Sequence, residues 1–160
     1  MSLHLLDSLA IVRPLIREVF EPQNILDVGS GAGLPGVILA IMLPRVQVHC
    51  VDAVAKKAAF IQQASISLGL KNLISHHARI EDLPLHFDVI TSRAFSSLLD
   101  FVSLTTKNLK PEGRWLAMKG VVTAEELTPV ATDWDVFHVE PLKVPGLDAN
   151  RNIVWMKKRV

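Results

Sequence analysis

The sequence predicts an α/β fold: a doubly wound, mostly parallel seven-stranded sheet with a C-terminal antiparallel hairpin. From residue 24 onward, short apolar runs typical of buried strands alternate with stretches of helical period. A loop with four glycines in ten residues, "DVGSGAGLPG" at 27–36, joins the first predicted strand to a helix. The last two predicted strands are joined by "PGLDAN", which is too short for a parallel crossover and therefore indicates an antiparallel pair.

The composition indicates one globular domain over residues 1–160. Apolar residues make up 49% of the chain and charged residues 21%, and the formal net charge is +1. No apolar run reaches the roughly 18 residues of a membrane span, and the N-terminus lacks the layout of a signal peptide. Cys50 is the one cysteine, so a disulfide framework and a cysteine-rich zinc site are excluded. We therefore expect a cytoplasmic monomer without metal or membrane association.

The elements follow in order along the chain. The first twenty residues are helical in period, with Pro14 predicted to kink this stretch or to start a second helix. Their apolar residues share one face: Leu5, Leu6, Leu9, Val12, Leu15, Ile16 and Val19. Strands are then predicted at 24–29, 46–52, 72–80, 87–94, 114–120, 135–144 and 151–159. Helices are predicted at 36–43, 53–70 and 96–109, the second capped by Gly69, and a short helix follows a capping box of Thr123 and Glu126.

Ligands of a doubly wound sheet bind beyond the carboxyl ends of its parallel strands. The segments that follow the predicted strands therefore form the candidate site: 27–36, 52–53, 79–82, 91–96 and 119–120.

Two cofactors fit the glycine-rich loop. Gly31, Gly33 and Gly36 match G-x-G-x-x-G, a fingerprint of dinucleotide binding. The frame "DVGSGAG", which runs from Asp27 through Gly29 to Gly33, instead resembles the first motif of S-adenosylmethionine-dependent methyltransferases. Both frames present backbone N–H groups after a strand and before a helix.

Three features favour S-adenosylmethionine. Asp27 precedes the glycines, next to where the amino group of the cofactor would lie. The chain ends in a methyltransferase-like hairpin, and 160 residues leave no room for the second domain that most dehydrogenases use. Asp52 ends the second predicted strand, where both dinucleotide-binding folds and methyltransferases place a ribose-binding acid. It therefore does not distinguish between the two cofactors. The adenine is expected near Ile80 and either Glu81 or Asp82, after the third strand.

Residues and motifs that the sequence lacks limit the groups that could accept the methyl group. It contains no tyrosine, and no Asn/Asp-Pro-Pro-aromatic motif follows the fourth strand, which argues against methylation of an exocyclic amino group. Cys50 lies in the second strand, so we interpret it as a core residue and not as the nucleophile for carbon-5 methylation. Ser92, Arg93 and Phe95 follow the fourth strand, and Lys119 ends the fifth. This set suits an acceptor that is already nucleophilic and lies near phosphate.

Several segments together resemble the glucose-inhibited division protein B family, whose members are bacterial small-subunit (16S) ribosomal RNA guanine-N7 methyltransferases. They are "HLLDSL", "DVGSGAGLPG", "VDAVAKKAAFIQ", "RIEDLP", "FDVITSRAFSSL", "MKG" and "VPGLDANRNIV", and they are spread nearly from one end of the chain to the other. Members usually carry a further N-terminal helical segment, which this sequence lacks. The resemblance implies S-adenosylmethionine as cofactor and ribosomal RNA or the small ribosomal subunit as partner.

The resemblance also assigns residues. It places contacts to S-adenosylmethionine at Gly29, Leu34, Ile80, Glu81 and Arg93, which join the Asp27, Gly31, Gly33 and Asp52 already taken from the loop and the second strand. It places basic groups suspected of touching RNA or substrate at Arg79, Arg93 and Lys119. With Arg151 these cations are predicted to form a basic rim, and His4 and Asp7 lie in the motif beside the pocket.

Guanine N7 has a free lone pair, so its methylation needs no general base, and catalysis can come mainly from positioning the two reactants. A cation at N7 would oppose the transfer, so we expect Arg93 to hold phosphate, a carboxylate or O6. The alternative for Arg93 is an ion pair with Asp27 or Glu81 that only shapes the pocket. Two other functions stay open: methylation of a protein or small molecule, and a nucleotide-binding assembly protein without catalysis.

Overall fold

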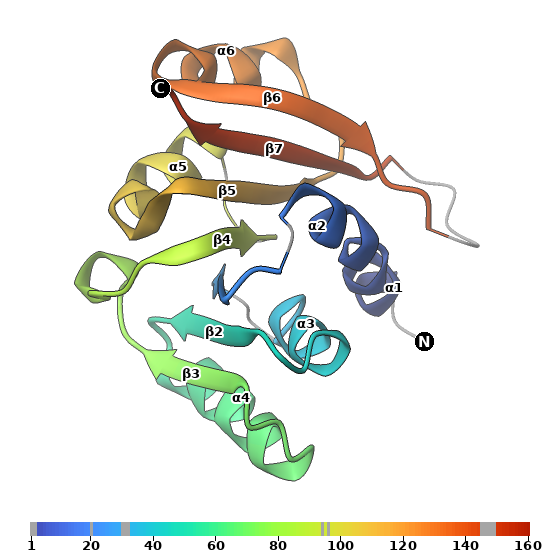
Figure 1. Cartoon of the computed structure of the whole chain (residues 1–160), viewed down its shortest axis with the longest axis vertical. Helices are drawn as coiled ribbons and strands as arrows, with labels where there is room; N and C mark the ends of the chain where they lie inside the picture. Colours follow the sequence, from blue (N-terminus) through green and yellow to red (C-terminus); the bar gives the residue numbers. More distant parts are fainter. Residues whose placement is uncertain (1–2, 20, 30–32, 94, 96, 145–149) are drawn as a thin grey trace.

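A sheet forms the centre of the computed structural model, which describes residues 3–19, 21–29, 33–93, 95, 97–144 and 150–160. Its strands within these residues are β1 (Asn24–Val28), β2 (Gln47–Asp52), β3 (Leu73–His77), β4 (Phe87–Ser92), β5 (Leu109–Lys119), β6 (Trp134–Pro141) and β7 (Asn152–Lys158). They lie in the order β3-β2-β1-β4-β5-β7-β6 (Figure 1). β1 to β5 pair in parallel, whereas β7 is antiparallel to both β5 and β6. The predicted mostly parallel seven-stranded sheet with a C-terminal antiparallel hairpin is confirmed.

Helices cover both faces of the sheet. They are α1 (Leu3–Ala10), α2 (Val12–Glu18), α3 (Gly36–Met42), α4 (Ala55–Ser67), α5 (Leu98–Thr105) and α6 (Ala124–Asp133), with short 3₁₀ turns η1 (Ile80–Asp82) and η2 (Thr106–Asn108). Buried residues of α2, α3 and α4 join one core cluster, in which Ile25 represents β1. Those of α5 and α6 join a second cluster with Leu26, the next residue of β1. Because successive strand residues point to opposite faces, the sheet is doubly wound.

The N-terminal segment differs from the single helical face that the sequence predicts. It forms two helices, with Pro14 in the first turn of the second, where a missing N–H is tolerated. Ile11 and Leu15 are fully buried, whereas Leu9 is 37% exposed and Ile16 44% exposed. The predicted start of a second helix at Pro14 is confirmed, whereas the prediction that Leu9 and Ile16 share the buried face is wrong, since both are exposed.

Two strand boundaries also differ. β3 ends at His77, before the predicted end at residue 80, and the chain then turns into η1. β5 begins at Leu109, so it includes the "KPEG" segment predicted as a loop. Its register against β4 shifts between the pair of Phe87 with Leu109 and the pair of Val89 with Arg114. Phe87 and Leu109 are both buried, and their burial keeps this irregular segment against the sheet.

The predicted helix caps are confirmed in part. Gly69 follows α4 with a φ of 63°, and its backbone N–H donates to the Ile66 carbonyl. Thr123 is the N-cap of α6, and its hydroxyl accepts a hydrogen bond from the backbone N–H of Glu126 at 3.3 Å. The Glu126 carboxylate pairs with Lys119, which ties this helix start to the end of β5.

Two histidines meet across β2 and β3. Nδ1 of His49 lies 2.8 Å from Nε2 of His76, the rings are stacked with centroids 5.1 Å apart, and the Phe87 ring meets His49 edge-on. Burial and the neighbouring histidine lower the pKa of His49 from 6.5 to about 4, and burial lowers the pKa of His76. The pair is therefore neutral at neutral pH.

We expect the free energy of unfolding to fall as the pH is lowered from 6.5 towards 4. In this window the unfolded chain takes up a proton at His49 while the folded chain does not, so acid favours unfolding. Because the rings are partly exposed, the expected loss is only about 1–2 kcal/mol. Urea unfolding at about pH 7 and about pH 4.5 measures it. His49→Asn should reduce the loss, whereas replacement of the exposed His86 by asparagine should preserve it, and equal losses in all three proteins would contradict the assignment.

Candidate functional site

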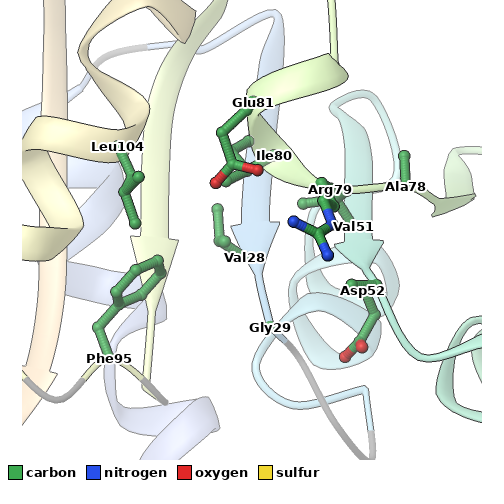
Figure 2. A pocket seen from close by; sticks show the side chains of 11 residues that line it. Val28, Gly29, Val51, Asp52, Ala78, Arg79, Ile80, Glu81, Phe95 and Leu104 are labelled. Atoms are coloured by element: carbon green, nitrogen blue, oxygen red, sulfur yellow. The ribbon is translucent and has the colours of Figure 1, made fainter.

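A pocket of about 440 Å³ opens at the carboxyl ends of β1 and β2, and we call it the first pocket. Figure 2 shows Phe95 and Leu104 on one side of it and Asp52 and Arg79 on the other. Its further lining includes Val28, Gly29, Val51, Ile80 and Glu81. Largely apolar walls with a few polar groups are typical of sites that bind a small molecule or cofactor.

Backbone pairing continues past the strand ends and builds the floor of the first pocket. The N–H of Gly29 donates to the Val51 carbonyl at 3.0 Å, and that of Ala78 donates to the Asp52 carbonyl at 3.1 Å. The Asp52 side chain is only 8% exposed, and its Oδ1 accepts a hydrogen bond from the backbone N–H of Val54 at 2.9 Å. Asp52 is thus held in one orientation at the pocket before any ligand enters.

The turn η1 forms a wall of the first pocket and is held by η2. Nζ of Lys107 donates a hydrogen bond to the Glu81 carbonyl. The buried side-chain amide of Asn108 donates to the carbonyls of Leu83, at 2.8 Å, and Leu85, at 3.0 Å. These contacts keep the predicted adenine-binding segment in place without using the side chains that line the pocket.

The predicted cofactor residues separate into groups. Four of them line the first pocket: Gly29, Asp52, Ile80 and Glu81. Arg93 lines the neighbouring pocket described below. Gly33 and Leu34 are not among the residues that line the first pocket in the described part of the chain, and Gly31 lies outside the described residues. The contacts assigned to these residues stay predictions.

Asp27 and Gly36 organise the junction between the glycine-rich loop and α3. Asp27 is fully buried, and its Oδ2 accepts a hydrogen bond from the backbone N–H of Gly36 at 2.8 Å. A Cβ atom on Gly36 would lie 2.3 Å from Sγ of Cys50, so only glycine lets α3 approach β2 this closely. Cys50 is 1% exposed, which confirms it as a core residue. Asp27 therefore shapes the loop, and its contact with the amino group of a cofactor stays a prediction.

A second pocket of about 270 Å³ lies at the carboxyl ends of β4 and β5, beside α1 and the start of β7. Its polar lining comprises His4, Asp7, Arg93, Lys119, Arg151 and Asn152. Phe95 lines both the first pocket and a small cavity that is also lined by Arg93 and Lys119. The Phe95 ring rests on the buried Phe101, with centroids 5.3 Å apart. The small cavity therefore shares Phe95 with the first pocket and both Arg93 and Lys119 with the second, so the two pockets are neighbours.

Ion pairs balance most of the charge in the second pocket. Nε of Arg151 donates to Oδ2 of Asp7 at 3.0 Å, and Nζ of Lys119 lies 3.2 Å from the Glu126 carboxylate. Arg93 forms no ion pair within the described residues, and its buried Nη1 has no hydrogen-bond partner among them. Both roles predicted for Arg93, the contact with a ligand and the ion pair with Asp27 or Glu81, stay predictions.

The predicted basic rim is not one continuous feature. Arg79 lines the first pocket, together with Asp52 and Glu81, whereas Arg93, Lys119 and Arg151 line the second. The strand order explains this division, because Arg79 follows β3, which lies on the far side of β1 from β5. The role of Arg79 towards RNA or substrate stays a prediction.

Sequence reasoning missed three residues that build the site. Leu104 lines the first pocket from α5 and is 40% exposed. The one feature of the sequence that could have indicated it is that this apolar side chain lies beside the buried face of a helix. Lys107 and Asn108 support η1 from a distant segment. No local pattern announces their contacts, because these depend on how η2 packs against the loop after β3.

The residues that the structure describes contain no group of three or more histidine, cysteine, aspartate or glutamate side chains placed to hold a metal ion. None of the helices formed by these residues is long and apolar enough to cross a membrane.

Comparison with known proteins gives a consistent picture. A family model described as "GidB: rRNA small subunit methyltransferase G" matches residues 1–154. A protein of Methylibium petroleiphilum named ribosomal RNA small subunit methyltransferase G is 56% identical over 158 residues, which is 98% of this chain and 72% of that protein. A protein of the same name from Polaromonas naphthalenivorans is 54% identical, over 98% of this chain and 73% of that protein.

Solved structures share the fold at low sequence identity. A SAM-dependent methyltransferase from Aquifex aeolicus superposes with a TM-score of 0.75 at 18% identity, covering 96% of this chain and 91% of that one. TrmK from M. capricolum, in complex with S-adenosyl-homocysteine, gives 0.69 at 10% identity, covering 99% of this chain and 69% of that one. At such identities the comparison supports the fold alone.

Proposed function

The chain belongs to the GidB family of small-subunit ribosomal RNA methyltransferases, and we therefore propose that it transfers a methyl group from S-adenosylmethionine to N7 of a guanine in that RNA. The methyltransferase activity, the cofactor and the RNA substrate rest on family membership and fold. Guanine N7 as the acceptor atom, and the residues that serve it, are the finer part of the proposal. The monomeric state, the cytoplasmic location and the single methyltransferase domain over residues 1–160 stay predictions.

The first pocket fits S-adenosylmethionine. Its carboxylate, Asp52, is buried and oriented by the backbone of Val54, as a group that accepts hydrogen bonds from two ribose hydroxyls must be. Ile80, Leu104 and Phe95 provide apolar surface for a flat aromatic ring. When bound there, the cofactor supplies an electrophilic methyl group on its sulfonium sulfur.

The second pocket supports an electron-rich base as the acceptor. It adjoins the first pocket at Phe95, whose ring can stack on a base, and it carries donors at Arg93, Lys119 and Asn152. No residue has to remove a proton from guanine N7, so these side chains serve to orient the base and to keep water out. Arg93 would hold O6 or phosphate away from N7, because a cation at N7 would oppose the positive charge that develops on the ring.

The observation that carries the proposal is the pairing of the two pockets: an apolar pocket with an oriented carboxylate directly beside a polar pocket that contains no cysteine. Carbon-5 methylation of a pyrimidine would need a thiol there, and the one cysteine of the chain is buried in β2. Attack by a free lone pair needs neither a thiol nor a base.

Mass spectrometry of small-subunit RNA tests the proposal directly. RNA from cells that lack the gene should miss one 7-methylguanosine, and the purified chain with S-adenosylmethionine should restore it. Methylation at another atom would overturn the N7 assignment but would still support methyl transfer to RNA by this chain. Cofactor binding without transfer to RNA would instead favour an assembly protein, and transfer to protein or a small molecule alone would favour the other enzyme.

A further inference from the structure

Asp7 is a buried carboxylate of which only one oxygen has a hydrogen-bond partner among the described residues. It lies on α1, it is 3% exposed, and it lines the second pocket. Oδ2 accepts the hydrogen bond from Nε of Arg151 at 3.0 Å. Oδ1 is closed to water and has no hydrogen-bond partner among the residues that the structure describes. A buried oxygen of this kind destabilises the protein until a donor reaches it.

The family reaction specifies which donors can arrive. If N7 of guanine faces the methyl group, the opposite edge of the base, with N1–H and the exocyclic amino group, faces away from the first pocket. Enzymes that act on a base outside the helical stack recognise it by hydrogen bonds to this edge. Both groups on the edge are donors, so a carboxylate is their natural partner. Asp7 is the one carboxylate among the described residues that line the second pocket.

We propose that Asp7 selects guanine in the second pocket by accepting hydrogen bonds from N1–H and the exocyclic amino group. This inference rests on the proposed function. Because Oδ1 is closed to water, the base would meet it after a small rotation of the carboxylate. Arg151 is then a positioning residue that holds the other oxygen. Adenine is rejected because its N1 is an acceptor and would face the carboxylate.

A purely structural role for Asp7 makes different predictions. The pair joins residues 144 positions apart and ties α1 to the chain just before β7, so its loss should loosen the second pocket whichever partner is removed. Arg151→Gln and Asp7→Asn both remove this ion pair. Only Asp7→Asn also removes the charge that the base would meet.

Inosine provides the probe, since it lacks the exocyclic amino group and keeps N7 and O6. Small-subunit RNA is prepared with guanosine or with inosine at the nucleotide that mass spectrometry identifies as methylated. Single-turnover methyl transfer at saturating S-adenosylmethionine is measured for both RNAs. The parent should methylate inosine about tenfold more slowly, the usual effect of losing one hydrogen bond to a charged group. Asp7→Asn should reduce this ratio to below about threefold, with cofactor affinity changed less than about threefold.

Arg151→Gln is the matched control. This variant should lower the rate of methyl transfer to both RNAs by the same factor, so the tenfold ratio between the two rates should match that of the parent. Equal rates on guanosine and inosine in the parent would overturn the inference without the use of any variant. An unchanged ratio in Asp7→Asn would also overturn it and leave a structural ion pair. If the parent methylates neither RNA, the proposed function fails, and that outcome is distinct from both of these.

Discussion

Replacing Asp52 with asparagine is expected to weaken binding of S-adenosylmethionine by roughly 10- to 100-fold. The buried carboxylate lines the first pocket, and its hydrogen bonds to the ribose hydroxyls would be charge-assisted. Asparagine has the same shape and can still accept the hydrogen bond from the backbone of Val54. The fold should therefore stay intact while one ribose partner changes from an acceptor to a donor.

Isothermal titration calorimetry with S-adenosylmethionine measures this effect. Asp135→Asn serves as the control, since Asp135 lies on β6 in a half-buried ion pair with Lys157 and lines neither pocket. Its affinity should match that of the parent. If Asp52→Asn binds as tightly as the parent while remaining folded, Asp52 is not the ribose ligand and the orientation of the cofactor in the first pocket is wrong.

Replacing Gly36 with alanine is expected to destabilise the protein by about 1–3 kcal/mol. In an ordinary helix the same change would be favourable by about 1 kcal/mol. Here the new Cβ atom would lie 2.3 Å from Sγ of Cys50 and 2.9 Å from Oδ2 of Asp27, so α3 would have to move away from β2. The close approach of the helix to the strand outweighs helix propensity at this position.

A double-mutant cycle with Cys50→Ala tests the cause. Alone, Cys50→Ala should cost about 1 kcal/mol through a small cavity and should leave methyl transfer in place. In the Gly36→Ala background the same change removes the nearest clashing atom and should restore part of the lost stability. Urea unfolding of the four proteins gives the coupling. Additive effects would show that the contact with the sulfur is not the reason for glycine at position 36.

Local patterns in the sequence predicted the order and nature of most elements, for reasons that act over short distances. Alternating apolar runs and helical periods depend on which side chains must leave water, and this is decided within each segment. The short connection before residue 151 can only join antiparallel neighbours, and Gly69 ends α4 because its φ of 63° suits glycine. Asp52 lines the first pocket for a similar reason, since the residue at the end of a parallel strand reaches the edge of the sheet where ligands bind, and its contact with the ribose stays a prediction.

Contacts between distant segments could not be predicted in this way. β7 lies between β5 and β6, and this order places Arg151 within reach of Asp7. The pairing of β2 with β3 likewise brings His49 to His76 and lowers both pKa values. Each contact depends on strand order and side-chain direction together, and neither is encoded in the spacing of residues along one segment.

Motif, hydrophobic period and strand end are local properties, and they were enough to predict the fold class, the family and the edge of the sheet at which the candidate site lies. The division of that edge into two pockets depends on the tertiary structure. The assembled sheet places Arg79 with Asp52 in one pocket and Arg93 in the other, and it turns Asp27 inward to hold the start of α3. A side chain meets its partners through the packing of whole elements, which fixes burial and direction only once the sheet is assembled.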